Sequence, residues 1–351
     1  LWIINNMAYS TISKPSLHFN TKLWTGNSTD NTAITGVGFQ PDFLWIKNRT
    51  DTNSHALVNS TTGATEYLES NTGDAEASHA NMVKSFDTDG FTLGNIGRVN
   101  ASSNTYVGWN WKANGGTTSS NTDGSITSTV QANTTSGFSI VTFTGTGANA
   151  TVGHGLGVAP KLIIVKRRPG AQSTRVGIND LGWGNLLYLD STSASSAVAS
   201  SFQSTAPTSS VFSVGTDTGV NGSGDSSLAY CFAEKKGYSK FGSYVSNGVS
   251  GDGTFVYTGF KPAFVIHKRT DSAGDWRSWN NKADAFNQND KSIFPNSNAS
   301  EYDTTAVGVD FLSNGIKWRQ TDTTNNNPSG GTFIYMAFAE EPLVANVGAS
   351  I

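Results

Sequence analysis

The most regular feature of the chain is a short apolar run that occurs three times between the same two boundaries. Each copy begins with glycine, has proline three positions later and ends on a lysine: GFQPDFLWIK (38–47, ending on Lys47), GVAPKLIIVK (157–166, ending on Lys166) and GFKPAFVIHK (259–268, ending on Lys268). Side chains of a strand alternate between its faces, so Phe43 and Trp45 are expected to point one way and Leu44 and Ile46 the other. Apolar residues on both faces predict a central strand that is covered on both sides.

Two further landmarks recur at nearly constant distances from these runs. Each run is preceded by a segment from phenylalanine to glycine: FNTKLWTG (19–26), FSIVTFTG (138–145) and FGSYVSNG (241–248). Each run is followed by a largely apolar segment: TYVGWNWKA (105–113), SSLAYCFAE (226–234) and TFIYMAFAE (332–340). The first phenylalanine precedes the lysine by 28, 28 and 27 positions. Repetition at a nearly fixed spacing predicts an internal triplication.

The stretches between these landmarks also predict strands. A turn followed by an alternating strand is expected in each copy, at TDGFTL (88–93), SSVFSV (209–214) and SNGIKW (313–318). Asp-Gly and Asn-Gly favour tight hairpin turns, although the middle copy lacks the glycine. Helical periodicity is weak and limited to short stretches around 76–86 and 195–202. We therefore expect an all-β protein of three tandem β-sandwich units of jelly-roll type, with barrels as the alternative.

The landmarks divide the chain into six parts. The expected boundaries are 1–17 for an N-terminal segment, 18–113 for unit one, 114–135 for a polar linker, 136–236 for unit two, 237–341 for unit three and 342–351 for a C-terminal tail. The stretch from 114 to 137 is rich in Gly, Ser and Thr, whereas Phe232 and Phe241 are only nine positions apart. We therefore expect units two and three to be joined tightly and unit one more loosely.

The composition excludes several classes of partner. Charged residues make up 14% of the 351 residues, against about 25% in typical soluble domains, and hydroxyl and amide side chains fill the polar positions. The net charge of -3 and the lack of Lys or Arg runs exclude an electrostatic site for nucleic acid or an anionic membrane. No apolar run approaches the length of a membrane-spanning helix, and no secretory signal is expected in LWIINN. Because MAYSTISKPS resembles a natural start, residues 1–6 are interpreted as coming from an upstream initiation codon.

Residues that could carry chemistry offer few patterns. The single cysteine, Cys231, lies in LAYCFA and is expected to be a buried thiol, which excludes an intrachain disulfide and Cys-rich zinc sites. The loops NTDGS (121–125), DTDG (87–90) and NGSGDSS (221–227) contain oxygen donors, but none has the spacing of a calcium loop, so turns explain them. The five histidines have no metal-binding spacing, and His267 is expected in the core. We predict no metal and no cofactor.

The recurring lysines and the exposed aromatic residues are the remaining candidates for binding. Lys47, Lys166 and Lys268 could line a shared groove, but repetition together with their strands favours a structural role, either snorkelling from the strand end or pairing with a carboxylate.

Sugar binding combines an apolar ring face with nearby amides and carboxylates, and the segment DWRSWNNKADAFNQND (275–290) has that mixture. The candidate glycan contacts are Trp276, Trp279, Asp275, Arg277 and Asn280 in this segment and Trp183 in NDLGWGNLLY. Trp276 and Trp279 are three positions apart and cannot face the same way in a regular strand. Packing between units or subunits is the alternative role.

Enzyme chemistry is poorly supported. Glu66 with Glu69, or Asp74 with Glu76, could form a glycosidase pair, but sequence spacing does not establish the required separation, and surface carboxylates are the simpler interpretation. There is no GxSxG motif and no glycine-rich phosphate loop before a helix. We therefore predict a protein that is not an enzyme.

The recurring sequence segments of the chain resemble those of tail-fibre-like virion proteins of marine tailed bacteriophages. The similarity is carried by TKLWTGN with GVGFQPDFLWIKNR, by GFSIVTFTGTGANATVGHGLGVAPKLIIVKRR, by FVYTGFKPAFVIHKRTDSAGDW and by AFAEEPLVANV, which together cover most of residues 8 to 346. The resemblance implies a component of a phage particle. It identifies no catalytic or binding residues, because the group has none that are agreed.

Together these observations predict a non-catalytic virion protein, part of a tail fibre or spike that attaches to host-surface glycan. A homotrimer in contact with other virion proteins is expected, assembled in the host cytoplasm and located in the extracellular particle, without nucleic acid or membrane insertion. The alternatives are a capsid decoration or cement protein and a glycan-cleaving tailspike domain.

Overall fold

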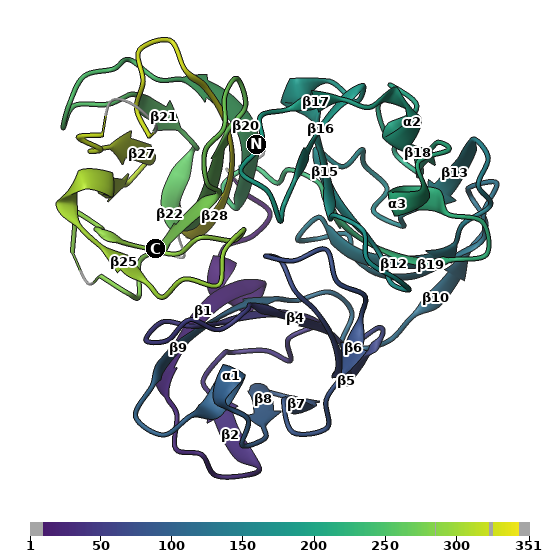
Figure 1. The fold of residues 1–351 in the computed structure, drawn as a ribbon, viewed down its shortest axis with the longest axis horizontal. Helices are drawn as coiled ribbons and strands as arrows, with labels where there is room; N and C mark the ends of the chain where they lie inside the picture. The colour runs from purple at the N-terminus through teal and green to yellow at the C-terminus, as the bar shows by residue number, and fades with distance from the viewer. Residues whose placement is uncertain (1–9, 285, 323–325, 344–351) are drawn as a thin grey trace, which may run out of the picture.

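The chain folds into three β-rich lobes arranged around a common centre (Figure 1). The computed structural model describes residues 10–284, 286–322 and 326–343. Nearly all the regular structure consists of antiparallel strands, and the α-helices are single turns of four residues. The predicted all-β class is confirmed. Each lobe contains a broad sheet and a smaller outer sheet, the layering of a β-sandwich.

Unit one contains a six-stranded sheet and a three-stranded outer sheet. The broad sheet has the order β1 (Phe19–Thr25), β9 (Thr105–Trp111), β3 (Phe43–Asn48), β4 (Ala56–Asn59), β5 (Gly63–Leu68) and β6 (Ala77–Ser78). The outer sheet has the order β2 (Thr32–Thr35), β8 (Gly90–Leu93) and β7 (Val83–Asp87). A 3-10 turn, η1 (Pro15–Leu17), precedes β1, and α1 (Gly97–Asn100) precedes β9. The helical tendency around 76–86 is not realised, because β6 and β7 occupy that stretch.

Unit two contains the largest sheet. Its order is β10 (Ser119–Asn121), β11 (Ser128–Asn133), β12 (Phe138–Thr144), β19 (Ser226–Phe232), β14 (Leu162–Arg167), β15 (Arg175–Ile178), β16 (Asn185–Tyr188) and β17 (Ser196–Ala197). The outer pair is β13 (Ala150–Gly153) with β18 (Val211–Val214). The short helices are η2 (Asn179–Leu181), α2 (Ala199–Phe202) and α3 (Thr218–Asn221), and α2 lies in the predicted stretch 195–202.

The stretch expected as a polar linker is therefore part of unit two. β11 pairs with β12 along its whole length, and β10 pairs with β11 at the edge of the sheet. Val130 faces the apolar core of unit two, whereas Gln131 donates from Nε2 to Ser60 Oγ (3.0 Å) and Thr61 Oγ1 (2.8 Å) of unit one. Only β10 lies at the edge and is largely exposed, whereas β11 is an inner strand whose buried residues include the polar Ser128 and Gln131, and such polar residues gave the stretch the composition of a linker.

The broad sheet of unit three has the fewest strands. Its order is β20 (Ser239–Val245), β28 (Thr332–Pro342), β22 (Phe260–Arg269) and β23 (Arg277–Asn280). The outer sheet has the order β21 (Phe255–Tyr257), β27 (Gly315–Trp318) and β26 (Val309–Leu312). A separate pair, β24 (Lys291–Ser292) with β25 (Tyr302–Asp303), and the turn η3 (Thr305–Val307) lie between β23 and β26.

The central four strands have the same order in every unit. The sequence landmarks form β1-β9-β3-β4 in unit one, β12-β19-β14-β15 in unit two and β20-β28-β22-β23 in unit three. The lysine strand lies third in each set, with a neighbour on both sides. This recurrence of topology accompanies the recurrence in sequence.

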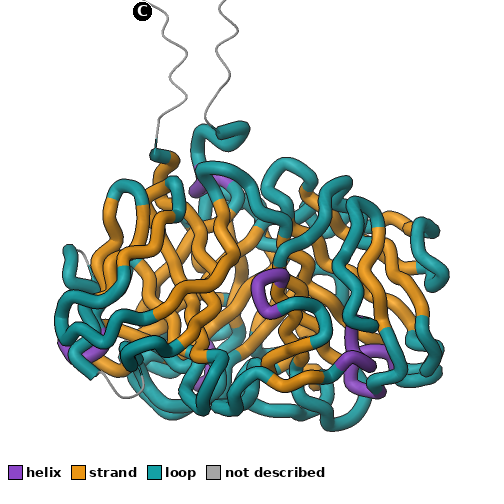
Figure 2. Tube along the Cα trace, turned by 90° about the horizontal axis from the view of Figure 1, so that it is seen from above, coloured by secondary structure: helices purple, strands orange, loops and turns teal. Residues whose placement is uncertain are grey.

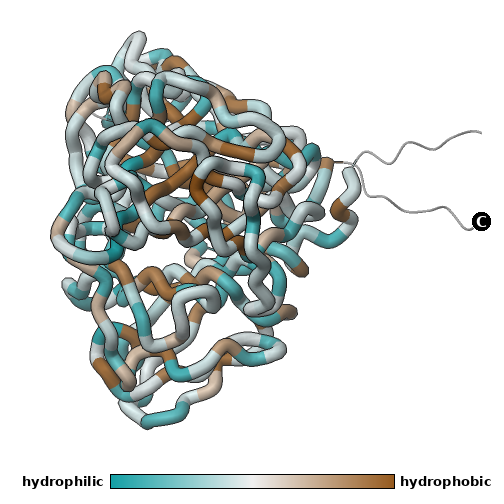
Figure 3. The backbone as a smooth tube through the Cα atoms, turned by 90° about the vertical axis from the view of Figure 1, so that its right-hand side faces the viewer, coloured by the Kyte–Doolittle hydropathy of each residue, from teal (hydrophilic) through white to brown (hydrophobic). Residues whose placement is uncertain are grey.

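The alternating faces of the lysine strands build two kinds of core. Phe43, Trp45, Leu162, Ile164, Phe264 and Ile266 point into one apolar cluster shared by all three units. Leu44 and Ile46, Ile163 and Val165, and Val265 point outward into clusters that belong to units one, two and three separately. The predicted two-sided burial is confirmed. In the tube view, apolar stretches lie mostly inside the molecule (Figure 3).

Aromatic rings join the units at the centre. Phe43 of unit one stacks on Tyr230 of unit two, with ring centroids 4.1 Å apart. Phe19 of unit one stacks on Phe338 of unit three at 5.0 Å, and Phe232 of unit two meets the same ring at 6.0 Å. Unit one therefore packs against both other units through buried aromatic rings. The looser attachment expected from the sequence is not found.

A backbone hydrogen bond of the same kind closes each seam between units. The acceptor is always the carbonyl two residues after the recurring lysine. Glu76 N donates to Arg168 O, Ser195 N to Thr270 O and Glu301 N to Arg49 O, each at 2.9 Å. These bonds join unit one to two, two to three and three to one. The three units therefore form a closed ring.

The recurring lysines are buried at these seams. Lys47, Lys166 and Lys268 are at most 3% exposed, and their ammonium groups donate to backbone carbonyls. Lys166 donates to Gly73 O of unit one at 2.7 Å, and Lys268 donates to Thr192 O of unit two at 3.2 Å. Burial lowers the pKa of each lysine to about 8. The lysines have a structural role, as favoured above, but carbonyl oxygens take the place of the expected carboxylates.

The chain enters and leaves the described structure on one side of the ring. In Figure 2 both ends of the described chain lie on the same face of the molecule. The opposite face and the outer rim are formed by loops and by the outer sheets.

Candidate functional site

The three tryptophans predicted to contact glycan are buried. Trp276 is 3% exposed, lies in the shared central core, and its Nε1 donates to Tyr188 O of unit two at 2.8 Å. Trp279 is fully buried in the core of unit three, and Trp183 packs edge-on against Phe202 in the core of unit two. The opposite orientation of Trp276 and Trp279 agrees with their spacing. Because none of these rings has a free face, the structure corrects the expectation that they are available to stack on a sugar.

Asp275 and Arg277 hold neighbouring loops in place. Asp275 is exposed and accepts a hydrogen bond from Asn296 Nδ2 at 2.8 Å. Arg277 is 6% exposed, lies over the Phe294 ring at 4.4 Å and donates to Ser292 Oγ at 3.1 Å. Burial lowers the pKa of Arg277 to about 10. These contacts describe packing within unit three.

Asn280 forms the turn at which the chain leaves the broad sheet. Its Oδ1 accepts from Lys282 N at 3.1 Å and from Ala283 N at 3.0 Å. Asn59 forms the same kind of turn at the end of β4, where its Oδ1 accepts from Thr61 N and Thr62 N. A short side chain that bonds the backbone two or three residues ahead is a common turn device. The role of Asn280 is therefore shared by unit one.

After this turn the chain of unit three takes a different path. In units one and two, two further strands extend the broad sheet, β5-β6 and β16-β17. Among the described residues of unit three, the outer side of β23 forms a single bridge, between Ser278 and Ile293. Residues 286–290 instead reach the outer sheet, where Asn289 pairs with Val309 of β26 through N–H···O bonds of 2.8 and 3.0 Å. The segment picked out in the sequence thus connects the two layers of unit three.

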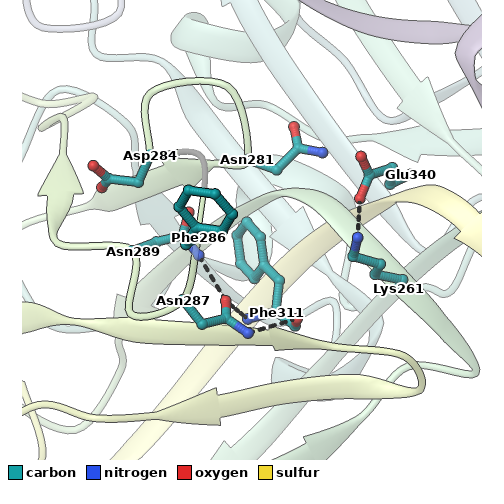
Figure 4. Close-up of a pocket in the computed structure, with 8 residues that line it drawn as sticks. All are labelled: Lys261, Asn281, Asp284, Phe286, Asn287, Asn289, Phe311 and Glu340. Carbon is teal, nitrogen blue, oxygen red and sulfur yellow. Dashed lines mark hydrogen bonds and ion pairs between the residues drawn. The ribbon is translucent and has the colours of Figure 1, made fainter.

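A pocket lies between this segment, β26 and the broad sheet (Figure 4). Its volume is about 250 Å³, and it is lined by Lys261, Asn281, Asp284, Phe286, Asn287, Asn289, Phe311 and Glu340. Phe286 is 84% exposed, the highest value among the large apolar residues that are described, whereas Phe311 is 4% exposed. We call this site the unit-three pocket.

Three amide side chains line the pocket, and two of them are fixed by backbone groups. Asn287 Oδ1 accepts from Phe311 N at 2.9 Å, and Asn287 Nδ2 donates to Phe311 O at 3.1 Å. Asn289 Nδ2 donates to Asn287 Oδ1 at 3.0 Å and to Val309 O at 3.3 Å. Asn289 is 3% exposed, and its Oδ1 has no hydrogen-bond partner among the described residues. Asn281 Oδ1 and Asp290 Oδ1 are likewise buried without a partner among the described residues.

The charged groups of the pocket are already paired. Lys261 Nζ lies 2.7 Å from Glu340 Oε2, and Lys291 Nζ lies 3.0 Å from Asp284 Oδ1. Hydrogen bonds that the ammonium groups donate to these carboxylates raise the pKa of Lys261 and of Lys291. Asp284 also accepts from the backbone N–H groups of Asp290 and Lys291, both at 2.9 Å. The first ion pair joins β22 to β28 within the broad sheet, and the second joins Asp284 of the segment to β24.

The lining combines an aromatic ring with amide and carboxylate groups. An exposed ring beside amide groups and carboxylates is the usual composition of a sugar site. In the described part of the chain, no group of three or more His, Cys, Asp or Glu side chains is placed to hold a metal ion.

The sequence analysis selected this segment but missed its exposed ring. Phe286 stands in NNKADAFNQND, where its only apolar neighbours are alanines. A lone aromatic residue in a polar run is typical of an exposed ring, and this signal could have identified it. The pairing of Asn289 with Val309, 20 positions away, has no local signature.

Comparison with known families gives one match. A family model described as a domain of unknown function (DUF7483) matches residues 14–342, which includes all three units. No curated protein and no solved structure shows significant similarity. Within the described ranges, no helix is long and apolar enough to cross a membrane.

Proposed function

We propose that this chain, which belongs to the DUF7483 family, is a non-catalytic glycan-binding protein that acts through the unit-three pocket. The observation that carries the proposal is the exposed Phe286 ring beside the amide and carboxylate side chains that line the pocket. The ring offers an apolar surface to the face of a sugar, and amide and carboxylate groups can form hydrogen bonds with its hydroxyl groups.

The location of the pocket supports this role. It lies where unit three departs from the strand order shared by the other units, so it is not needed to complete the common core. Together with the resemblance to phage tail-fibre-like proteins, this supports a role in attachment of a virion to host-surface glycan. The broad sheets then serve as a rigid scaffold, and the loop of unit three makes the contact.

The direct test is retention of the purified chain on immobilised host polysaccharide. Wild-type protein is expected to bind, and Phe286→Ala is expected to weaken binding about tenfold or more, because stacking on an aromatic ring is lost. Tyr257→Ala is the matched control: it removes a ring that is 53% exposed on β21, at the other edge of the same outer sheet. Equal loss of binding in both variants, or no retention of wild type, would contradict the proposal.

A second measurement separates attachment from its alternatives. Immunogold labelling of virions is expected to place the protein on tail or fibre tips. Gold over the head would favour a decoration protein. Release of reducing sugar from the polysaccharide would favour a glycan-cleaving tailspike domain.

A further inference from the structure

We propose that strand β21 of unit three is a docking site for an extended segment of another protein, which pairs with its free edge. β21 (Phe255–Tyr257) lies at the border of the outer sheet and, among the described residues, pairs with β27 alone. This surface is separate from the unit-three pocket, and the proposal does not depend on glycan binding. It rests on a comparison of β21 with the corresponding strand of unit two.

The backbone groups of Phe255 and Tyr257 point toward the free edge. Thr258 N donates to Asn314 O, in the turn before β27, at 3.1 Å. In an antiparallel pair only alternate residues bond the neighbouring strand, so Val256 bonds β27 as Thr258 does, and the residues between them face the other way. In the part of the chain that is described, no group bonds the backbone N–H or C=O of Phe255 or Tyr257. These four groups are therefore available to a further strand.

Unit two contains the same strand with its edge covered. Val152 of β13 corresponds to Val256 of β21, because the two residues pair with the same position of the following landmark. That position is Phe212 in SSVFSV and Ile316 in SNGIKW. Unit two therefore shows what kind of segment closes this edge.

The cover in unit two is a short extended segment that precedes β11. Thr151 N donates to Ser125 Oγ and Thr151 O accepts from Ile126 N, both at 2.9 Å. Gly153 O accepts from Ser128 Oγ at 2.8 Å. Ile126 also forms a parallel bridge with β13, and its side chain, 7% exposed, packs into the core of unit two. One β-branched apolar residue and a few polar groups are thus sufficient to cover the edge.

Unit three lacks this cover because the connection before it is short. The chain uses residues 112–127 to pass from β9 to β11, but only residues 233–238 to pass from β19 to β20. The second connection contains no counterpart of β10 and β11. It therefore cannot supply a segment that covers β21.

The exposed side chains of β21 favour a protein partner. Phe255 and Tyr257 are 42% and 53% exposed, whereas Ala33 and Thr35 hold these places in β2 of unit one, which also pairs with a single strand among the described residues. Free strand edges are usually protected by charged residues, proline or a bulge. Aromatic rings beside a free edge instead suit strand addition, in which backbone bonds give affinity and the rings cover side chains of the partner.

The covering segment of unit two also defines the chemistry of the partner. The partner segment donates a backbone N–H to Phe255 O and carries a β-branched apolar residue beside Val256, as Ile126 does in unit two. Asn121 of the covering segment lies where a side chain of Gly153 would be, and Tyr257 fills this place in unit three. The partner segment is therefore extended, largely uncharged and small at this point.

A synthetic peptide that copies residues 122–128 (TDGSITS) is the probe, with Asn121 left out for this reason. Titration of the labelled peptide with the full chain is followed by fluorescence anisotropy. We expect saturable binding with a Kd of about 0.1–1 mM, which is weak because the free peptide must be ordered. The Phe255 and Tyr257 amides are expected to exchange hydrogen more slowly with peptide present. Absence of saturation up to about 5 mM overturns the proposal.

Two matched controls locate the contact. The peptide with Ile126→Asp, and the protein with Phe255→Ala together with Tyr257→Thr, are each expected to bind at least about tenfold more weakly. The protein variant copies the edge of unit one and changes only exposed residues, so its melting temperature is expected to equal that of wild type. Undiminished binding in either control would place the peptide elsewhere, for instance on β13, and overturn the proposal.

Hydrogen exchange of the chain alone distinguishes other occupants of the edge. The Phe255 and Tyr257 amides are expected to exchange quickly without peptide at every protein concentration. Slow exchange at all concentrations would mean that the chain covers the edge with its own terminal residues. Slow exchange only at high concentration would mean that a second copy covers it. Both results would overturn the assignment to another protein, while glycan binding through the unit-three pocket would be unaffected.

Discussion

Units one and three have the same inner strands and different outer parts. In both units the first landmark strand, the last landmark strand, the lysine strand and the strand after it lie in one order. After the shared asparagine turn, unit one adds β5 and β6 to this sheet, whereas in unit three Asn289 pairs with Val309 of β26. The inner strands cannot change without disturbing the core of all three units. The outer segments can change, and the pocket is found there.

The outer sheets of units one and three also differ, in the size of their exposed side chains. Phe255 and Tyr257 of β21 are 42% and 53% exposed on either side of the buried Val256. Ala33 and Thr35 hold the corresponding places around Ile34 in β2 of unit one. The larger rings of unit three therefore lie on a surface that is small and polar in unit one. Exposed rings of unit three thus include Phe255 and Tyr257 on β21, Tyr302 on β25 and Phe286 in the loop that lines the pocket.

One difference between the units lies within the lysine strand itself. The residue before the recurring lysine is Ile46 in unit one and Val165 in unit two, but His267 in unit three. His267 is 1% exposed, its Nδ1 lies 2.9 Å from the Tyr244 hydroxyl oxygen, and its ring lies 4.7 Å from that of Trp318. Burial, with Arg277 and Lys268 nearby, lowers its pKa well below the ordinary value. The core of unit three therefore contains a titratable group that the other two lack at this position.

The largest expected effect concerns the shared core. Phe264→Ala removes a buried ring that lies 5.1 Å from Trp109 and 5.5 Å from Phe19, both in unit one. We expect a loss of about 3–5 kcal/mol in the free energy of unfolding, in one cooperative transition. Urea unfolding followed by tryptophan fluorescence and by circular dichroism measures it.

Val265→Ala is the control for this prediction. It truncates the next residue of the same strand, whose side chain points into the separate core of unit three. Its cost is expected to be smaller, about 1–3 kcal/mol, because fewer buried atoms are removed. Independent unfolding of unit three in the Phe264→Ala protein would contradict the prediction, because the inner strands of the three units would then not unfold together.

The next effect is an acid sensitivity of unit three. The folded pKa of His267 lies below 6.5, so at acid pH the unfolded chain binds the proton more readily. Stability is then complete above about pH 6.5 and falls as the pH decreases, by up to about 1.4 kcal/mol per pH unit. His267→Val, which copies unit two, is expected to make this decline shallower between pH 6.5 and 4.5.

The measurement is urea unfolding of both proteins across this pH range. At pH 7 the variant is expected to be less stable by about 1–3 kcal/mol, because the Tyr244 hydroxyl loses its partner. His55, whose pKa is lowered to about 3 by burial, remains in both proteins and accounts for a residual decline. An unchanged slope in the variant would show that His267 does not contribute to acid sensitivity.

The smallest effect concerns a seam. Arg49 bonds both carboxylate oxygens of Glu301, at 2.7 and 2.8 Å, and their side chains are 13% and 11% exposed. Arg49→Ala is expected to cost about 1–2 kcal/mol, between the values for exposed and for buried ion pairs. Lys84→Ala, which removes the more exposed pair with Asp30, is expected to cost at most about 1 kcal/mol. Equal melting temperatures for Arg49→Ala and wild type would mean that the ring does not depend on this contact.

The fold class and the inner strands could be predicted from the sequence because their signals are local. Alternation placed Phe43 and Trp45 opposite Leu44 and Ile46, and the structure confirms the two faces. The closed ring could not be predicted, because the bonds Glu76–Arg168, Ser195–Thr270 and Glu301–Arg49 join residues far apart along the chain. Recurrent lysines marked the seams, but nothing in the sequence shows that backbone carbonyls accept their hydrogen bonds. The expected homotrimer stays a prediction, which light scattering can test.

The candidate site was predicted in part. The sequence pointed to residues 275–290, and the pocket is lined from this segment, yet Trp276 and Trp279 are packed inside and Phe286 is the exposed ring. Aromatic residues stabilise cores and also bind sugars, so residue type alone cannot separate the two roles. The position of each ring relative to the two sheets decides which role is possible.

The sequence by itself determined where the strands lie, which faces are apolar and that one pattern occurs three times, because strand geometry relates neighbouring residues in a fixed way. The tertiary structure decided that the three units share one core, that the supposed linker completes a sheet and that the Asn289 oxygen is left unpaired. The physical reason is that burial and hydrogen-bond partnership depend on what covers each face. Those partners come from distant parts of the chain, and only folding brings them together.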